Sequence, residues 1–221
     1  MLKQILFQLT VFVLFTTFSL YAVENELHVK KSSKVPVVFD GNVSTFEYCD
    51  AVRVNFRNGH GEVAAYVKSD GKFIYFAFEI PDKSVHLGDD IVIMLDTDNM
   101  RPENPDSNDV RAYIRRKLEN SRMQKGSKGK WADYWGKWEY CARSYDSGWE
   151  VECRLPLNAP ADSAFSPSAK DKTGEKTVRM GIAFRIWDNS PQKKWSWPIS
   201  SDENKPDTWA TLVLEEDEKN K

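Results

Sequence analysis

The feature that most constrains the fold is a run of five large apolar residues, Ile91 to Leu95, with acidic residues on both sides. A short apolar run between polar residues is typical of a strand that is buried on both faces. The preceding segment, Lys72–Ile80, has the same character, because its β-branched and aromatic residues point alternately to two sides. We predict that these segments form two central strands of a β-sandwich, with which the rest of the chain pairs.

Other segments also carry strand-like patterns between turn signals. Ser69–Gly71 predicts a hairpin between Glu62–Lys68 and Lys72–Ile80. The further predicted strands are Lys34–Gly41, Ala51–Phe56, Glu62–Lys68, Val110–Lys117, Gly136–Arg143, Trp149–Leu155, Lys176–Asp188 and Thr208–Glu215. Leu118–Trp135 shows no clear pattern, and no segment has convincing helical spacing. The sequence therefore predicts an all-β domain, a single antiparallel β-sandwich of immunoglobulin-like or jelly-roll-like arrangement.

The amino-terminal end predicts export. Met1–Ala22 has a short polar start, an apolar stretch and a small residue before a charged one, as in a secretory signal peptide. We expect cleavage after Ala22, a secreted or periplasmic location and no stable membrane insertion of the mature chain. A retained single-span anchor over Ile5–Ala22 is the alternative. The expected order is then a polar lead-in at 23–34, the sandwich at 35–214 and a charged tail at 215–221.

Composition narrows the class of ligand. Lys and Arg number 31 against 33 Asp and Glu, which gives a formal net charge of −2. Such a balance leaves no electrostatic footprint for nucleic acid. Eight Trp residues are more than a core of this size usually takes. Some of them are therefore candidates for exposed binding surfaces.

The three cysteines permit a disulfide if the protein is exported. Cys141 and Cys153 lie symmetrically about Ser147. If residues 145–149 form a hairpin turn, these two cysteines face each other across two strands. We predict a Cys141–Cys153 disulfide that leaves Cys49 free, although the odd count keeps other pairings open.

The order of six short motifs resembles that of family 9 carbohydrate-binding modules and the wider group of DOMON-like β-sandwiches. The motifs are Val38–Gly41, Phe73–Phe78, Asp90–Asp96, Gly148–Leu157, Met180–Phe184 and Trp209–Leu214. The resemblance implies a non-catalytic module that binds a polysaccharide or oligosaccharide and assists glycoside hydrolases in carbohydrate catabolism. The chain departs from the family in two respects. The opening turn is usually followed by a Trp, where in this chain Tyr48 stands nearest. Sugar-binding members carry an aromatic residue just before the Asp that starts the core strand, where this chain has His86-Leu87-Gly88.

Exposed aromatic rings are the candidates for sugar contact. The apolar face of a pyranose stacks on an indole or phenol ring, while carboxylates, amides and arginines bond its hydroxyls. Two Trp-containing clusters offer such rings, one at Trp131–Trp138 and one at Trp187–Trp197. From them we select Trp131, Trp135, Trp195 and Trp197, with Asp90 and Arg111 as hydroxyl partners. The alternative is that half of these rings plug the ends of the sandwich, while Trp149 and Trp209 are expected in the core.

The loop from Asp96 to Asp109 is rich in carboxylates and could bind calcium, an ion that family members carry. The candidate ligands are Asp96, Asp98 and Asp106. Met100 falls where an EF-hand would place its third ligand, so a solvated polar loop is the preferred interpretation.

A heme-binding or protein-interaction module without a sugar ligand is the alternative function, because some DOMON-like relatives hold heme with Met and His. The candidate heme ligands are Met94, Met100, Met123 or Met180 with His28, His60 or His86. A buried Met such as Met94 is more often core. We expect no enzymatic activity, because the pairs Asp89/Asp90 and Glu150/Glu152 are not placed to converge across a cleft as glycoside hydrolysis requires.

Overall fold

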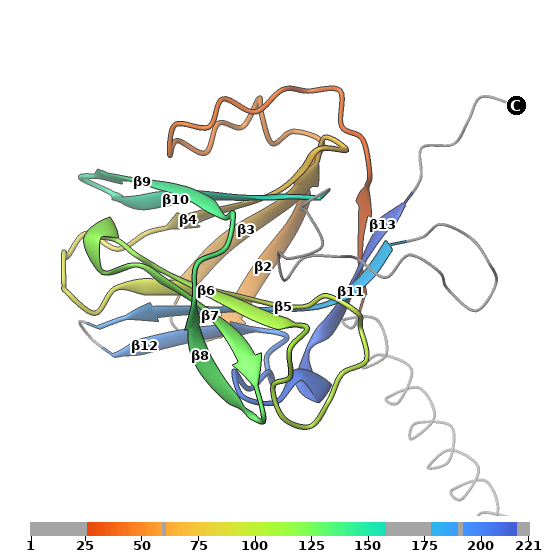
Figure 1. Ribbon diagram of the computed structural model, residues 1–221. Coiled ribbons are helices and arrows are strands. Elements are labelled where there is room, and N and C mark those ends of the chain that lie inside the picture. Colours follow the sequence, from red (N-terminus) through yellow and green to blue (C-terminus); the bar gives the residue numbers. More distant parts are fainter. Residues whose placement is uncertain (1–25, 59–60, 158–177, 190–191, 216–221) are drawn as a thin grey trace, which may run out of the picture.

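The two apolar runs that the sequence singles out lie in the middle of two different sheets (Figure 1). β4 (Phe73–Ile80) is the central strand of a five-stranded sheet, and β5 (Asp90–Asp96) lies inside an eight-stranded sheet. The structure is a computed structural model that describes residues 26–58, 61–157, 178–189 and 192–215. The predicted all-β sandwich is confirmed. The predicted signal peptide at 1–22 lies outside the described residues.

The eight-stranded sheet has the order β1-β13-β11-β5-β6-β7-β8, and β12 pairs with β11. Besides β5 it contains β1 (Glu26–Lys30), β6 (Asp109–Arg115), β7 (Arg122–Ser127), β8 (Lys130–Tyr134), β11 (Val178–Asp188), β12 (Lys193–Trp197) and β13 (Ala210–Glu215). The five-stranded sheet has the order β2-β3-β4-β10-β9. Besides β4 it contains β2 (Val52–Asn58), β3 (Gly61–Ser69), β9 (Glu139–Tyr145) and β10 (Gly148–Pro156). Two short 3-10 turns, η1 (Leu118–Asn120) and η2 (Pro206–Thr208), complete the described elements. Among the described residues, no helix has the length and apolar character needed to cross a membrane.

The core forms where the inner faces of the two sheets meet. Phe184 of β11 lies at its centre, with its ring 5.4 Å from that of Phe78 and 5.9 Å from that of Phe76. These edge-on contacts are a favoured geometry for buried aromatic rings. Strand β5 contributes Ile91, Ile93 and Leu95 to this core. Its alternate residues, Val92 and Met94, lie on the outer face and are buried as well.

Four strands were not expected from the sequence, because each is an edge or near-edge strand with few apolar residues. β1 lies within the predicted polar lead-in and pairs parallel to β13, so the sandwich is not purely antiparallel. β7 and β8 form a hairpin within the unpatterned stretch 118–135, and β12 pairs with β11. The β7–β8 turn places Lys128 and Gly129 at positive φ, as a two-residue hairpin turn requires. Gly126 of β7 is buried.

The segment 33–51 crosses the outer face of the five-stranded sheet, and it includes the predicted strand Lys34–Gly41, which forms no strand. It is held instead by Glu152 of β10, whose side chain is fully buried. The carboxylate accepts hydrogen bonds from the backbone N–H groups of Asp40 (2.8 Å) and Gly41 (2.7 Å) and from the Tyr48 hydroxyl (2.7 Å). Burial raises the pKa of Glu152, and these three donors oppose that rise.

Replacing Glu152 with Ala tests this attachment. The change leaves two backbone donors and one hydroxyl buried without an acceptor, so we expect a loss of about 2–4 kcal/mol in the free energy of unfolding. Urea denaturation of the Glu152→Ala variant measures that loss. Glu139→Ala is the matched control, because its carboxylate makes an exposed ion pair with Arg154 (2.6 Å) that contributes less than about 1 kcal/mol. Equal losses in both variants would contradict the assignment.

The predicted Cys141–Cys153 disulfide is wrong, because the hairpin register differs by one residue from the symmetrical arrangement. Tyr145 pairs with Gly148, so Cys141 pairs with Glu152, and Cys153 pairs with Tyr140. Successive strand residues point to opposite faces, so the two thiols lie on opposite sides of the sheet. All three cysteines are free: Cys49 is exposed, Cys141 half-buried and Cys153 buried.

We therefore expect three titratable thiols per chain in unfolded protein prepared without reductant. In the folded protein only Cys49 should react rapidly with a thiol reagent. Cys153 is inaccessible, and burial beside Glu152 raises the pKa of the Cys141 thiol to about 12, which suppresses its reactive thiolate. A count of one thiol after denaturation would show that two cysteines form a disulfide, as the sequence had predicted.

Candidate functional site

Side chains on the outer face of the eight-stranded sheet form rows, because cross-strand partners share a face. The rows run over β11, β5, β6 and β7. They consist of Trp187, Asp90 and Arg115; of Arg185, Val92, Tyr113 and Arg122; and of Ala183, Met94, Arg111 and Gln124. We call this surface the outer face. Its charged and aromatic residues surround a small apolar floor of Val92, Met94 and Ala183.

Glu203 ties the outer face together from the loop that precedes β13. Its carboxylate accepts a hydrogen bond from the Tyr113 hydroxyl (2.6 Å) and pairs with Arg185 Nη1 (2.5 Å) and Arg111 Nη1 (3.4 Å). Arg185 Nη2 also donates to Asp90 Oδ1 at 2.7 Å. Asp90, Arg185, Glu203 and Arg111 thus form one continuous chain of alternating charge, which we call the outer-face network.

Burial shifts the pKa values of two network residues, Asp90 and Arg111, and of the neighbouring Tyr113. It raises the pKa of Asp90, and the positive charges of Arg185 and Arg115 act against that rise. It lowers the pKa of Arg111, and it raises that of Tyr113 to about 12, with the Glu203 hydrogen bond adding to the rise. Such perturbed groups often mark binding sites, although structural networks produce them too.

Aromatic rings and guanidinium groups alternate along the same surface. Arg111 Cζ lies 4.3 Å from the Trp131 ring centroid and 4.9 Å from that of Tyr113. Arg122 Cζ also lies 4.9 Å from the centroid of the Tyr113 ring. Trp131 Nε1 also donates to Asn204 Oδ1 at 3.1 Å. These contacts fix the orientation of the Trp131 indole, which remains half-exposed.

The structure brings together three of the six residues selected from the sequence: Trp131, Arg111 and Asp90. Arg111 and Asp90 are 8% and 5% exposed, so most of their surface is already covered. The half-buried side chains around them, Trp131 and Trp187, offer more accessible surface. Arg111 is therefore better placed to orient Trp131 than to contact a ligand itself.

Trp195 and Trp197 do not belong to this surface. They pair with Ile186 and Phe184 of β11, which point into the core. Trp195 is 4% exposed, and the Trp197 ring packs 5.8 Å from that of Phe184. Trp187, the outward-facing member of this cluster, was not among the residues selected from the sequence. The alternation along β11 contains the signal, because inward Ile186 requires outward Trp187.

Trp135 lies apart from Trp131. It is 95% exposed and borders a cavity of about 500 Å³ between the β7–β8 hairpin and the start of β9. We call this cavity the Trp135 groove. Trp138, in the same sequence cluster, is a core residue whose ring stacks on Phe76 with an interplanar angle of 15°. Trp149 and Trp209 are buried, as expected.

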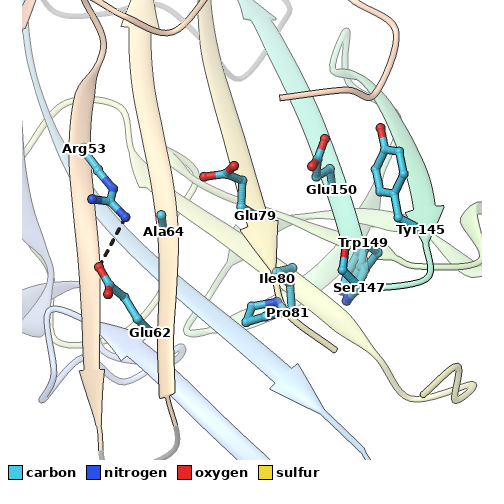
Figure 2. Close-up of a pocket in the computed structure, with 11 residues that line it drawn as sticks. Arg53, Glu62, Ala64, Glu79, Ile80, Pro81, Tyr145, Ser147, Trp149 and Glu150 are labelled. Atoms are coloured by element: carbon cyan, nitrogen blue, oxygen red, sulfur yellow. Dashed lines mark hydrogen bonds and ion pairs between the residues drawn. The ribbon is translucent and has the colours of Figure 1, made fainter. Parts of the chain in front are cut away.

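Figure 2 shows another cavity, of about 350 Å³, on the side of the five-stranded sheet that points away from the core. Carboxylates of Glu62, Glu79 and Glu150 border it, and Arg53 pairs with Glu62 at 3.2 Å. Its aromatic lining is limited, because Trp149 is 2% exposed and only Tyr145 presents a ring (Figure 2). This cavity lacks the stacked rings that the outer face provides.

The acidic loop is not simply solvated, because Asp96 and Asp109 at its two ends are fully buried. Burial raises the pKa of Asp96 to about 7, with Asp98 adding to the rise, and that of Asp109 to about 8, with Asp96 adding. Asp109 Oδ1 has no hydrogen-bond partner among the described residues. Buried carboxylates without a paired cation are compatible with calcium chemistry.

The geometry does not, however, gather the ligands predicted for calcium. Within the described residues, three carboxylate oxygens lie within 4.8 Å of one another only at Asp82, Asp89 and Asp188. There Arg116 supplies the positive charge, with Nη1 3.3 Å from Asp82 and 3.8 Å from Asp89. Calcium binding by Asp96, Asp98 and Asp106 stays a prediction from the sequence.

Heme binding likewise stays a prediction. Met94 packs in the apolar floor of the outer face, beside Trp209. Met180 faces the core between the sheets. His28 lies on β1, where its ring bonds Glu215 at 2.8 Å and Glu26 at 3.2 Å.

The fold matches solved structures of carbohydrate-binding modules. A family 9 module from Caldicellulosiruptor kristjanssonii in complex with cellotriose is 15% identical, with a TM-score of 0.62 over 88% of this chain and 96% of that chain. A family 9 module from the same organism in complex with glucose has the same identity and TM-score, again over 88% of this chain, and is itself covered to 98%. A candidate carbohydrate-binding protein from Bacteroides uniformis is 14% identical, with a TM-score of 0.57 over 86% of this chain and 99% of that chain. No protein-family model and no curated protein sequence matches the chain. The chain has the fold of family 9 carbohydrate-binding modules, as its motif order predicted.

Replacing Glu203 with Ala tests the outer-face network. The change leaves Arg185 and Arg111 without their shared carboxylate, and we expect a loss of about 2–3 kcal/mol in the free energy of unfolding after allowance for partial exposure. Asp207→Ala is the control, because Asp207 lies exposed on the same loop. Chemical denaturation compares the two variants. Equal stability would mean that Glu203 does not organise this surface.

Proposed function

We propose that this protein binds carbohydrate through the outer face without transforming it. The observation that carries the proposal is the outer-face network, with the half-exposed indoles of Trp131 and Trp187 on the same surface. Indole rings accept the apolar face of a pyranose, and charged side chains exchange hydrogen bonds with its hydroxyls. Both kinds of group are present on one sheet face.

The rigidity of the site supports this proposal. Each charged member of the network is bonded to at least one other member, and Arg111 is stacked between two rings. A ligand therefore meets side chains whose rotamer freedom has already been lost on folding. Pre-organisation of this kind lowers the entropic cost of binding.

Related folds indicate the class of ligand to try first. The family 9 modules that share the fold were solved with cellotriose and with glucose. We propose that this chain takes a neutral oligosaccharide or polysaccharide, with glucose-based chains as the first candidates. The predicted signal peptide Met1–Ala22 supports a secreted or periplasmic protein that assists glycoside hydrolases on other polypeptides.

The pairing of the carboxylates on the outer face disfavours a catalytic role for this surface. Asp90 and Glu203 both pair with Arg185, at 2.7 and 2.5 Å. A glycoside hydrolase needs one carboxylic acid to give a proton to the leaving group and a second carboxylate facing it across the substrate. Two carboxylates joined by one guanidinium are not placed to divide these roles.

The Trp187→Ala variant tests the ligand and the surface together. Loss of a stacking ring should weaken binding about fivefold, since such a contact contributes about 1 kcal/mol. The measurement is isothermal titration with glucose and cellotriose, followed by xylo- and manno-oligosaccharides. Phe46→Ala is the control, because Phe46 is a 72% exposed ring on another surface.

Wild-type protein that gives no saturable signal with any of these sugars would overturn the proposed function. Binding that survives in Trp187→Ala, but is lost when Tyr145 in the Figure 2 cavity is replaced by Ala, would move the site to the five-stranded sheet.

A further inference from the structure

The Trp135 groove has the shape and composition of a second ligand site. It lies where the edge of one sheet approaches the edge of the other, and its volume is about 500 Å³. Aromatic side chains line it from two separate segments, residue 39 and residues 134–140. They are Phe39, Tyr134, Trp135, Trp138 and Tyr140. Large exposed aromatic surfaces on a soluble protein usually mark binding.

Packing holds most of the groove in one shape. Trp138 is fixed by its stack on Phe76, with ring centroids 6.4 Å apart. Tyr134 lies across Gly136, where a Cβ atom would come within 2.5 Å of the Tyr134 ring. Lys125 lies 5.8 Å from the centroid of that same ring. Trp135 is almost fully exposed, so its ring is open to contact by a ligand.

The polar groups of the groove are few and balanced in charge. Arg122 and Glu139 line it with opposite charges, and Ser121 adds a hydroxyl. A strongly charged ligand gains little from such a pair. Rings interrupted by hydrogen-bonding groups suit a neutral sugar, whereas a peptide helix would need a continuous apolar strip.

Arg122 joins the groove to the outer face. Its guanidinium stacks over Tyr113, within the outer-face rows, and the same side chain lines the groove. From β11, which carries Trp187, to β7, which carries Arg122, there are three strand spacings. At about 4.8 Å each, they amount to roughly 14 Å, the span of a short oligosaccharide.

We infer that the Trp135 groove is a second subsite that holds the continuation of a glycan chain bound on the outer face. The ligand class is a neutral linear oligosaccharide or polysaccharide long enough to pass Arg122. This inference rests on the proposed function. It adds a dependence of affinity on chain length that the outer face alone does not require. Engagement of two linked subsites strengthens binding without any new contact at the first.

The test is affinity against chain length in wild-type protein, Trp135→Ala and Trp187→Ala. The probes are glucose, cellotriose and cellohexaose, measured by isothermal titration. We expect wild-type protein to bind cellohexaose about fivefold more tightly than cellotriose, as one added stacking contact provides. Trp135→Ala should remove that gain and leave glucose affinity within about twofold. Trp135 is 95% exposed, so its replacement should not disturb folding, and Phe46→Ala again serves as the matched control.

Equal affinities of wild-type protein for cellotriose and cellohexaose would overturn the inference. So would a length-dependent gain that persists in Trp135→Ala. These results differ from failure of the proposed function, in which the sugars fail to bind or Trp187→Ala leaves every affinity unchanged. A groove that binds a protein partner instead would show no response to chain length.

Discussion

Strand β5 is buried on both faces, and this constraint shapes the rest of the molecule. One face of β5 meets the five-stranded sheet across the main core, as in any sandwich. The other face carries Val92 and Met94, which would be exposed if the eight-stranded sheet were left open to solvent. The chain covers them with the segment that precedes β13, whose Trp209 packs against the outer face. A polar loop is thereby laid over a sheet surface and must satisfy its own charges there.

The outer-face network is the result of that covering. Glu203 reaches the sheet from the covering loop and meets three polar side chains at once: Tyr113, Arg185 and Arg111. Taking these charges partly out of water costs free energy, which is offset only if each finds a partner. The outcome is a rigid surface of rings and charged groups. Carbohydrate recognition needs that combination, because sugars present apolar faces and hydroxyls together.

The central strands could be predicted from the sequence because burial on both faces leaves an unbroken apolar run. The edge hairpin β7–β8 could not, since its residues are mostly polar and its main signal is the turn at Lys128 and Gly129. The predicted disulfide was wrong because the hairpin register differs by one residue, and such a shift exchanges the two faces of a strand.

Part of the site was predictable because it lies on strands that the apolar pattern of the sequence reveals. Asp90 and Arg111 lie on strands that the sequence identifies, so their neighbourhood could be anticipated. Trp195 and Trp197 were misplaced because β12 was not recognised as a strand, and its pairing with β11 turns both rings inward. Glu203 could not have been found, since it is 90 residues from Tyr113 and its role depends on how a loop folds over the sheet.

The most direct test of carbohydrate binding on the outer face is an NMR titration with cellotriose that follows both the backbone and the indole N–H resonances. We expect saturable shifts of the Trp131 and Trp187 signals, while the signal of buried Trp149 stays unchanged. Shifts confined to residues around the Figure 2 cavity, such as Tyr145 and Ser147, with Trp131 and Trp187 silent, would contradict it.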